Sequence, residues 1–284
     1  GTTTLDFSHT TAETVTLAIS SSSSPAANAL QCLKDSRSDP SCSLTFADAG
    51  FVFDVPTLTA CKTSADVTIR AVKKSDTAVQ CVGALTGTQA IKFWSTYSSP
   101  TSGTESVKIN SSAIATTSAG TPINLNFDIN GEASFTTIYD DAGQLQLNAQ
   151  YTNLAGIDFA GNDSFISKPV KIITYSDDSA AQCASNDASC SKFKKAGENF
   201  DLKVKAACWT GDADTDFTDN PATPNFELAA MSVSNGVIAP AGGRSGDLAV
   251  TSFNFVTANN GIHTVDQTVS EVGVFLFQTT ATIP

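Results

Sequence analysis

A turn followed by an alternating run of apolar and polar residues recurs along this chain and limits what it can fold into. The stretch Tyr139–Tyr151, YDDAGQLQLNAQY, has copies at Phe46–Phe53 (FADAGFVF) and Val269–Phe277 (VSEVGVFLF), and a looser copy at Thr10–Ile19 (TTAETVTLAI). Apolar side chains at every second position after a turn predict a half-buried β-strand. A repeated unit predicts a repeated fold, so we expect tandem β-domains.

An acidic residue and a glycine mark the three clearest turns. The acids are Asp48, Asp141 and Glu271, and the glycines are Gly50, Gly143 and Gly273. A carboxylate in a turn can accept hydrogen bonds from backbone N–H groups, and glycine allows a close approach of the neighbouring strand or a positive φ. We therefore expect these residues to be structural rather than catalytic.

Length and charge narrow the classes of function. The 284 residues suit two or three domains, and the 41% hydrophobic content is enough for real cores. Charged residues make up only 15%, against roughly 25% in an average soluble protein, and Thr and Ser are abundant. The net charge of −12 would repel nucleic acid and anionic membrane surfaces, so we exclude nucleic-acid binding.

The N-terminus suggests a piece of a longer protein. No apolar run approaches the roughly 18 residues of a membrane span, and the first residues lack the pattern of a secretory signal. The chain opens within what reads as a strand pair, so we expect that a leader was lost with whatever preceded Gly1.

Seven cysteines indicate local disulfides and an oxidising compartment. No pair has zinc-site spacing, and the histidines lie far from the cysteines in sequence. The expected pairs are Cys32 with Cys42, Cys183 with Cys190, and Cys61 with Cys81. The first two would close short loops that are rich in Ser, Asp and Asn. Cys208 is left either as a buried free thiol or as a competitor for one of these partners.

A second landmark sets the domain boundaries. TACKTSADVTIRAVKKSD (59–76) resembles KKAGENFDLKVKAACWTGD (194–212), at about the offset that separates Gly143 from Gly273. We expect an immunoglobulin-like sandwich at 57–173, another at 174–284 that stops without its last strand, and a partial sandwich of closing strands at 1–56. The expected strands are Asp66–Val72, Ala90–Ser95, Glu105–Ile109, Ile123–Ile129, Ala133–Ile138, Leu145–Tyr151, Ser164–Ile172, Phe200–Ala206, Asn225–Val233, Ala249–Phe255, Gly261–Val269 and Val274–Thr280. The fold class is therefore all-β, with tandem immunoglobulin-like antiparallel sandwiches pinned by local disulfides.

Longer motifs resemble a known bacterial family. SCSLTFADAGFVFDVP, YDDAGQLQLNAQY, GDADTDFTDNPATPNFELAAMSV, APAGG and TVSEVGVFLF occur in the order of the C-terminal region of MshQ-type proteins. These proteins are encoded with the mannose-sensitive haemagglutinin type IV pilus system of Gram-negative bacteria. The resemblance implies a pilus-associated surface protein built from β-sandwiches, either an adhesin or its stalk. Cys61 departs from the pattern, because it stands where the second copy has Gly197.

The sequence offers no catalytic constellation. His9 and His263 lack a supporting motif, and no nucleophile elbow, phosphate-binding loop or zinc-protease motif is present. His263 alternates with apolar neighbours on an expected strand, which predicts a solvent-facing residue. Adjacent acids such as Asp140 and Asp141 do not supply the opposed carboxylates of a glycosidase. We expect a non-enzymatic protein that requires no cofactor.

One acidic loop suggests calcium. GDADTDFTDNPATPN (211–225) carries Asp212, Asp214, Asp216 and Asp219, the hard oxygen ligands that calcium prefers. The glycine and the distal glutamate of an EF-hand are absent, so a solvated loop whose acids form turns is the alternative. Trp94 and Tyr97 leave a similar choice between core packing and a sugar-stacking platform.

These features favour an extracellular structural or adhesive module of a bacterial surface or pilus. Its partners would be other copies of itself or adjoining domains of a longer chain, pilus or cell-surface components, and glycans. A sandwich without its last strand could accept a strand from another subunit and form a filament, or the chain could be a fragment of a longer polypeptide. A secreted calcium-dependent glycan-binding module is the alternative from another class.

Overall fold

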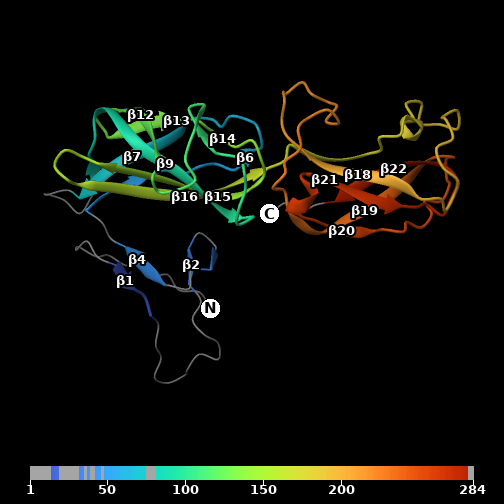
Figure 1. Ribbon diagram of the computed structural model, residues 1–284, viewed down its shortest axis with the longest axis horizontal. Helices are drawn as coiled ribbons and strands as arrows, with labels where there is room; N and C mark the ends of the chain where they lie inside the picture. Colours follow the sequence, from blue (N-terminus) through green and yellow to red (C-terminus); the bar gives the residue numbers. More distant parts are fainter. Residues whose placement is uncertain are drawn as a thin grey trace, which may run out of the picture.

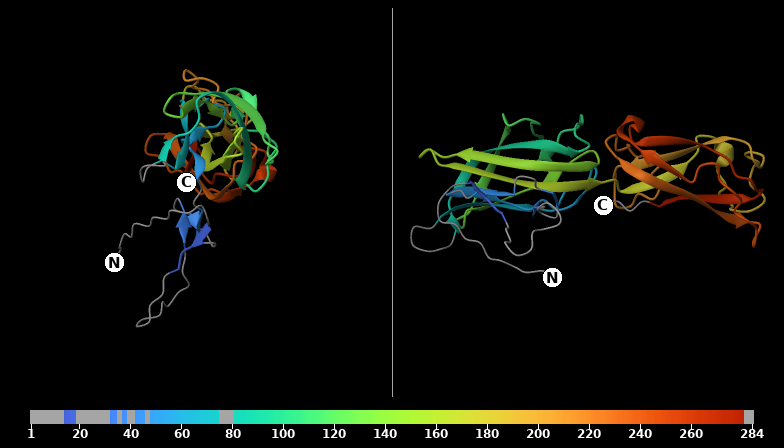
Figure 2. Two further views of the ribbon diagram at one scale, coloured as in Figure 1. Left: turned by 90° about the vertical axis from the view of Figure 1, so that its left-hand side faces the viewer. Right: turned by 90° about the horizontal axis from the view of Figure 1, so that it is seen from below.

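Two β-sandwiches lie end to end in the computed structural model, which describes residues 14–18, 32–34, 37–38, 42–45, 48–74 and 81–280 (Figure 1). The strands of both sandwiches run along the long axis of the molecule, and two further views agree (Figure 2). Apart from two single-turn 3-10 helices, η1 (Ser179–Ala181) and η2 (Thr257–Asn259), the regular elements in these residues are strands. The predicted fold class is confirmed.

The first sandwich packs a sheet of order β12-β9-β15-β16-β6 against a sheet of order β13-β7-β5, with β8 also paired to β7. A small sheet of order β11-β10-β14 lies beside them. The strands are β5 (Ala49–Val52), β6 (Leu58–Thr59), β7 (Val67–Lys74), β8 (Cys81–Gly83), β9 (Gly87–Ser99), β10 (Lys108–Ile109), β11 (Ser112–Ala113), β12 (Thr121–Phe127), β13 (Glu132–Phe135), β14 (Thr137–Ile138), β15 (Gly143–Thr152) and β16 (Asp158–Lys168).

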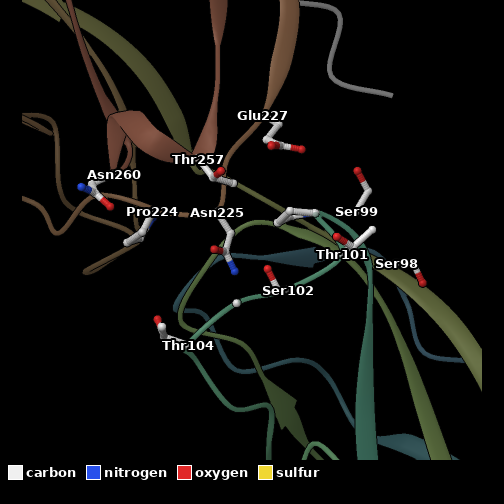
Figure 3. Close-up of a pocket in the computed structure, with 12 residues that line it drawn as sticks. Ser98, Ser99, Thr101, Ser102, Thr104, Pro224, Asn225, Glu227, Thr257 and Asn260 are labelled. Carbon is white, nitrogen blue, oxygen red and sulfur yellow. The ribbon is translucent and has the colours of Figure 1, made fainter.

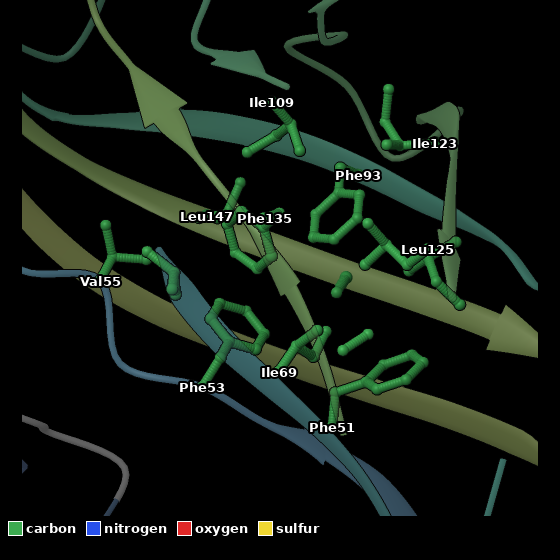
Figure 4. Packing of buried hydrophobic residues seen from close by; sticks show 14 of the residues in the cluster. Phe51, Phe53, Val55, Ile69, Phe93, Ile109, Ile123, Leu125, Phe135 and Leu147 are labelled. Atoms are coloured by element: carbon green, nitrogen blue, oxygen red, sulfur yellow. The ribbon is translucent and has the colours of Figure 1, made fainter. Parts of the chain in front are cut away.

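Alternation along these strands fills the first core. On β7 and β12 every second side chain is buried, which places Ile69 and Leu125 between the sheets. Phe93 and Phe135 pack with ring centroids 5.3 Å apart, and Leu147 is fully buried beside them (Figure 4). The strand after the repeated turn therefore supplies the core, as its pattern predicted.

The second sandwich has sheets of order β17-β18-β21 and β20-β19-β22. Its core contains Val204, Met231 and Phe255, with Phe226 packed edge-on against Phe255. Its strands are β17 (Lys171–Tyr175), β18 (Phe200–Ala207), β19 (Leu228–Ala239), β20 (Ser252–Phe255), β21 (Ile262–Gln267) and β22 (Val274–Thr280).

Two expectations about the first sandwich were wrong. Residues 49–53 belong to it, because Ala49, Phe51 and Phe53 lie in its core, so the sandwich begins before residue 57. The motif copy at Phe46–Phe53 thus contains β5, the first strand of this sandwich, rather than a closing strand of a partial sandwich. An alternating pattern reports which face is buried and does not report the place of a strand in the sandwich.

The expected strand Ser164–Ile172 is in fact two strands of different sandwiches. β16 ends at Lys168, and Ile172 lies in β17, which pairs with β18. Pro169 interrupts the run because it has no N–H to continue a ladder.

The N-terminal segment forms short ladders outside both sandwiches. β1 (Thr14–Thr16) pairs antiparallel with β4 (Ser43–Thr45), and β2 (Leu33–Lys34) pairs with β3 (Arg37–Ser38). These ladders lie beside the first sandwich (Figure 1). His9 lies outside the described residues.

Candidate interaction site at the junction of the two sandwiches

The backbone joins the sandwiches through a very short connection. β16 ends at Lys168 and β17 begins at Lys171. Backbone hydrogen bonds hold both ends of the connection, since Ala60 N donates to Lys168 O at 2.7 Å and Val170 N donates to Ala207 O at 2.9 Å. Trp209 N donates across the boundary to Ala60 O at 3.0 Å. The connection is therefore part of the ladders on both sides and not a free linker.

A disulfide also crosses the junction. Cys61 follows β6 in the first sandwich, Cys208 follows β18 in the second, and their Cα atoms are 5.5 Å apart. The expected pairing of Cys61 with Cys81 was wrong, and Cys208 is the competitor that takes Cys61. Cys81 lies on β8 as an exposed free thiol. The partners are 147 residues apart in sequence, so only the packing of two domains brings them together.

The other two disulfides pair as expected. Cys32 bonds to Cys42 and Cys183 bonds to Cys190, with separations of 10 and 7 residues. Both close local loops, so they do not connect the two sandwiches.

Contacts around the disulfide add to the junction. Lys62 Nζ lies 2.7 Å from Asp212 Oδ1 and 5.0 Å from the centroid of the Trp209 ring. Trp209 Nε1 donates to the same carboxylate oxygen at 3.0 Å. Asp212 and Lys62 are exposed, so this ion pair orients the loop but adds little stability.

The repeated turn of the first sandwich is the centre of the junction. Asp141 is fully buried, and its Oδ1 accepts from Ala142 N at 2.7 Å and from Asn225 N of the second sandwich at 2.9 Å. Asn225 Nδ2 also donates to Tyr139 Oη at 3.1 Å. Ala142 itself packs into the core of the second sandwich. The expected turn-capping role of Asp141 is thus present, and the same carboxylate holds the neighbouring domain.

Burial controls the protonation of this carboxylate. Loss of hydration on burial raises the pKa of Asp141 to about 6. The hydrogen bonds from Asn225 N–H and Ala142 N–H act in the lowering direction, and the negative charge of Glu105 adds to the rise. Burial also raises the pKa of Tyr139 and of Tyr97 on the same side of the junction. The junction therefore contains a carboxylate that titrates near neutral pH.

A polar cavity of about 560 Å³ opens beside this turn (Figure 3). The loop from Ser98 to Thr104 forms one wall, and Pro224, Asn225, Thr257 and Asn260 of the second sandwich form the other. Glu227 is its one charged lining residue. Hydroxyl and amide groups can bind a polar, uncharged ligand, but the lining contains no pair of groups for nucleophilic or acid–base catalysis.

The four aspartates of the acidic loop do not converge. Asp212 contacts Lys62 and Trp209, while Asp214 accepts from Thr210 Oγ1 at 2.8 Å and Asn220 Nδ2 at 2.7 Å. Asp216 accepts from Thr218 N and Oγ1 at 3.0 Å and 2.6 Å. Burial lowers the pKa of Lys205, and the negative charges of Asp219 and Asp216 oppose this shift. Among the described residues there is no group of three or more His, Cys, Asp or Glu side chains arranged to hold a metal. Calcium binding by this loop stays a prediction.

Two aromatic positions differ from expectation. Phe93 occupies the core position that we considered for Trp94, and Trp94 is only half-buried. His263 is half-buried rather than solvent-facing, because its ring stacks on Phe253 with centroids 4.4 Å apart. Burial lowers the pKa of His263, and its Nδ1 has no hydrogen-bond partner.

In the described part of the chain, none of the helices has the length and apolar character that crossing a bilayer requires.

Comparisons with known proteins give a family but no close relative. No curated protein matches the chain. Among solved structures, the D0-D1 domain of Intimin is 15% identical with a TM-score of 0.23, and covers 82% of this chain and 89% of its own. The adhesin InvE of Yersinia pseudotuberculosis is 16% identical with a TM-score of 0.34, and this chain covers 58% of its length.

Family models match both sandwiches. Residues 29–164 match "Domain of unknown function (DUF6701), first Ig-like domain", and residues 168–266 match "DUF6701, second domain". The boundary between the two matches coincides with the junction described above. Together the matches span most of the sequence, and the chain therefore belongs to the DUF6701 family.

Proposed function

We propose that this chain is a non-catalytic structural module of an extracellular bacterial adhesin or pilus-associated protein, such as the MshQ-type proteins that its motifs resemble. Its task is to hold two immunoglobulin-like sandwiches as one stiff unit that carries an adhesive part away from the cell. The observation that carries this proposal is the junction, where a disulfide between Cys61 and Cys208 lies beside the buried Asp141 carboxylate.

The junction geometry supports stiffness. Independent domains in one chain usually move relative to each other unless their interface is well packed. Here the connection is two residues long, Ala142 of one domain is buried in the core of the other, and the disulfide closes a second covalent path. Bending the molecule would have to break hydrogen bonds that are shielded from water, which is costly.

The direction of the strands supports a role under tension. The strands run along the long axis (Figure 1), and β15 pairs with β16 over ten residues, from Gly143 opposite Ser167 to Thr152 opposite Asp158. A pull along that axis loads the hydrogen bonds of the ladder together rather than one after another. A ladder of this kind suits a stalk.

Three disulfides support an extracellular location, since thiols stay reduced in the cytosol. The test uses the source bacterium grown under its native conditions. Intact cells are treated with an external protease, and the released peptides are analysed without reduction. We expect the peptides joined by Cys61 and Cys208 in the released fraction. Recovery of these peptides only after lysis, or only in reduced form, would contradict the proposal.

A further inference from the structure

The far end of the second sandwich repeats the groups that form the junction. β22 is the counterpart of β15, with an identical irregularity in its pairing. In the first sandwich Gln144 lies opposite Ser99 and Leu145 lies opposite Tyr97, so one residue of β9 is skipped. In the second sandwich Val274 lies opposite Ala239 and Phe275 lies opposite Val237, so one residue of β19 is skipped at the same place when Gly273 is aligned with Gly143.

Contacts around the glycines confirm the correspondence. A Cβ atom on Gly143 would lie 2.8 Å from Ser99 O, and one on Gly273 would lie 2.8 Å from Ala239 O. Cys61 N donates to Tyr139 O at 2.9 Å, and Gly197 N donates to Val269 O at 2.8 Å. The loop and turn that seat the second sandwich on the first therefore recur at the other end of the second sandwich.

At this far end the repeated groups are uncovered. Ala142 is 1% exposed within the junction, whereas Val272, which holds the same place in its turn, is 78% exposed. Asp141 is buried and Glu271 is exposed. Val272 thus holds, uncovered, the place by which Ala142 enters the core of the neighbouring sandwich.

The neighbouring strand β22 is also open. In the first sandwich β15 lies between β9 and β16, and β16 adds Phe159 and Phe165 to the core. In the described part of the chain β22 pairs with β19 alone, although Thr174 Oγ1 donates to Phe277 O at 3.0 Å. The rings of Phe200 and Phe277 pack together but stay partly exposed.

The other end of the molecule carries the complementary half. In the first sandwich Ala71 N donates to Gly131 O in the β12–β13 turn, and in the second Ala206 N donates to Gly261 O in the turn before β21. The two turns therefore correspond, and the one in the second sandwich borders the junction cavity through Thr257 and Asn260. Two residues before Gly131 in the β12–β13 turn, Ile129 is 87% exposed. Each end of the molecule thus presents one half of the contact that the junction between its two sandwiches already contains.

The N-terminal ladder supplies a strand in the right place. β4 ends at Thr45 and β5 begins at Ala49, much as β16 ends at Lys168 and β17 begins at Lys171. β4 pairs with β1 in a sheet that includes no strand of either sandwich. Adding β4 and β1 of another molecule beside β22 would give a sheet of five strands, like that of the first sandwich.

The geometry points to a second copy of this chain as the occupant: its β1–β4 ladder extends the β22 edge and its first sandwich sits on the turn around Val272. The contact is head to tail and does not close on itself, so it builds a filament. This inference deepens the structural role proposed above and rests on it.

Sedimentation velocity of the full chain over about a hundredfold range of concentration tests the inference. We expect species heavier than the 29.4 kDa monomer that grow with concentration. Val272→Asp should raise the dissociation constant at least about tenfold, because a carboxylate would be buried in the contact. Val52→Asp, at an exposed apolar position on β5, is the matched control and should assemble normally.

Hydrogen exchange at the same concentrations tests the strand. The amides of β22 should gain protection in the assembled species. A chain that stays monomeric throughout, a Val272→Asp variant that assembles like the parent, or assembly without protection of β22 would each overturn the inference. A monomer whose two sandwiches keep a fixed distance would leave the proposed structural role intact, whereas freely moving sandwiches would contradict that role.

Discussion

Asp141 connects the two domains through its fully buried carboxylate, which accepts hydrogen bonds from Ala142 N–H of the first sandwich and Asn225 N–H of the second. Its folded pKa of about 6 lies above the ordinary value of 3.8. The folded state therefore binds more protons than the unfolded state between these two values. By linkage, the contribution of Asp141 to stability is full below the unfolded pKa and is lost as pH rises through the folded pKa.

Asp141→Asn should remove this pH dependence. The amide keeps one oxygen acceptor without a charge to desolvate, so the variant should match the parent near pH 4 and be more stable than the parent above pH 6. Chemical denaturation at several pH values measures the difference. A parent whose stability does not fall relative to Asp141→Asn between pH 4 and pH 6 would show that burial does not control this group.

Asp141→Ala should behave differently at every pH. The backbone N–H groups of Ala142 and Asn225 would lose their acceptor in a buried place, which costs about 1 to 3 kcal/mol for each group left unpaired. Denaturant unfolding of this variant beside Asp141→Asn separates the lost hydrogen bonds from the lost charge. Equal stability of the two variants would argue against the contact.

Gly143 shows a second constraint at the residue scale. Its φ of 142° and the 2.8 Å approach of a Cβ to Ser99 O both oppose any side chain. We expect Gly143→Ala to destabilise the first sandwich by about 1 to 3 kcal/mol. Gly211→Ala is the control, because a Cβ there meets nothing within 4 Å, and it should change stability little. Thermal unfolding of both variants checks the comparison.

At the scale of elements, strands with their own alternating pattern could be predicted. β7, β15, β18 and β22 lie where the apolar positions placed them, since each turns apolar side chains toward a core. These side chains are buried on the first three strands and half-buried on β22. The same pattern could not place β5 in the right domain, and it ran across Pro169 into β17. Those assignments depend on which strands pair with each other, and the pattern within one segment does not report its pairing with a distant segment.

The junction was harder to predict for the same reason. The turn of Asp141 was recognised, but its partner Asn225 lies 84 residues away, and the partner of Cys61 lies 147 residues away. Cysteine spacing favours local pairs, and it correctly gave Cys32–Cys42 and Cys183–Cys190. One signal of the long-range disulfide was present in the sequence, because Cys61 stands where the second sandwich has Gly197.

Removing the long-range disulfide should cost more than removing a local one. The chain-entropy relation gives about 5 kcal/mol for Cys61–Cys208 and about 2.5 kcal/mol for Cys183–Cys190. Denaturant unfolding of the Cys61→Ser/Cys208→Ser and Cys183→Ser/Cys190→Ser double variants compares the two. Thiol titration of the unfolded, unreduced parent should give one free thiol, from Cys81. Equal losses, or a Cys61–Cys81 peptide in the mass spectrum, would contradict the assignment.

At the scale of the whole molecule, the two sandwiches and their junction form one rod (Figures 1 and 2). Three kinds of group join them: a buried carboxylate, a disulfide between half-buried Cys61 and buried Cys208, and an exposed ion pair between Lys62 and Asp212. Only the first two resist bending to a large degree, because water screens the third. We therefore expect the two sandwiches to keep a fixed orientation relative to each other.

A distance distribution between the two sandwiches measures whether their orientation is fixed. Spin labels are placed at Asn124→Cys on β12 and Thr264→Cys on β21, both exposed, in a chain that also carries Cys81→Ser. Double electron–electron resonance should give one narrow distribution in this chain. The distribution should broaden when Cys61→Ser, Cys208→Ser and Asp141→Ala are added together. A broad distribution in the chain with an intact junction would contradict the account, since the two sandwiches would then move as independent domains.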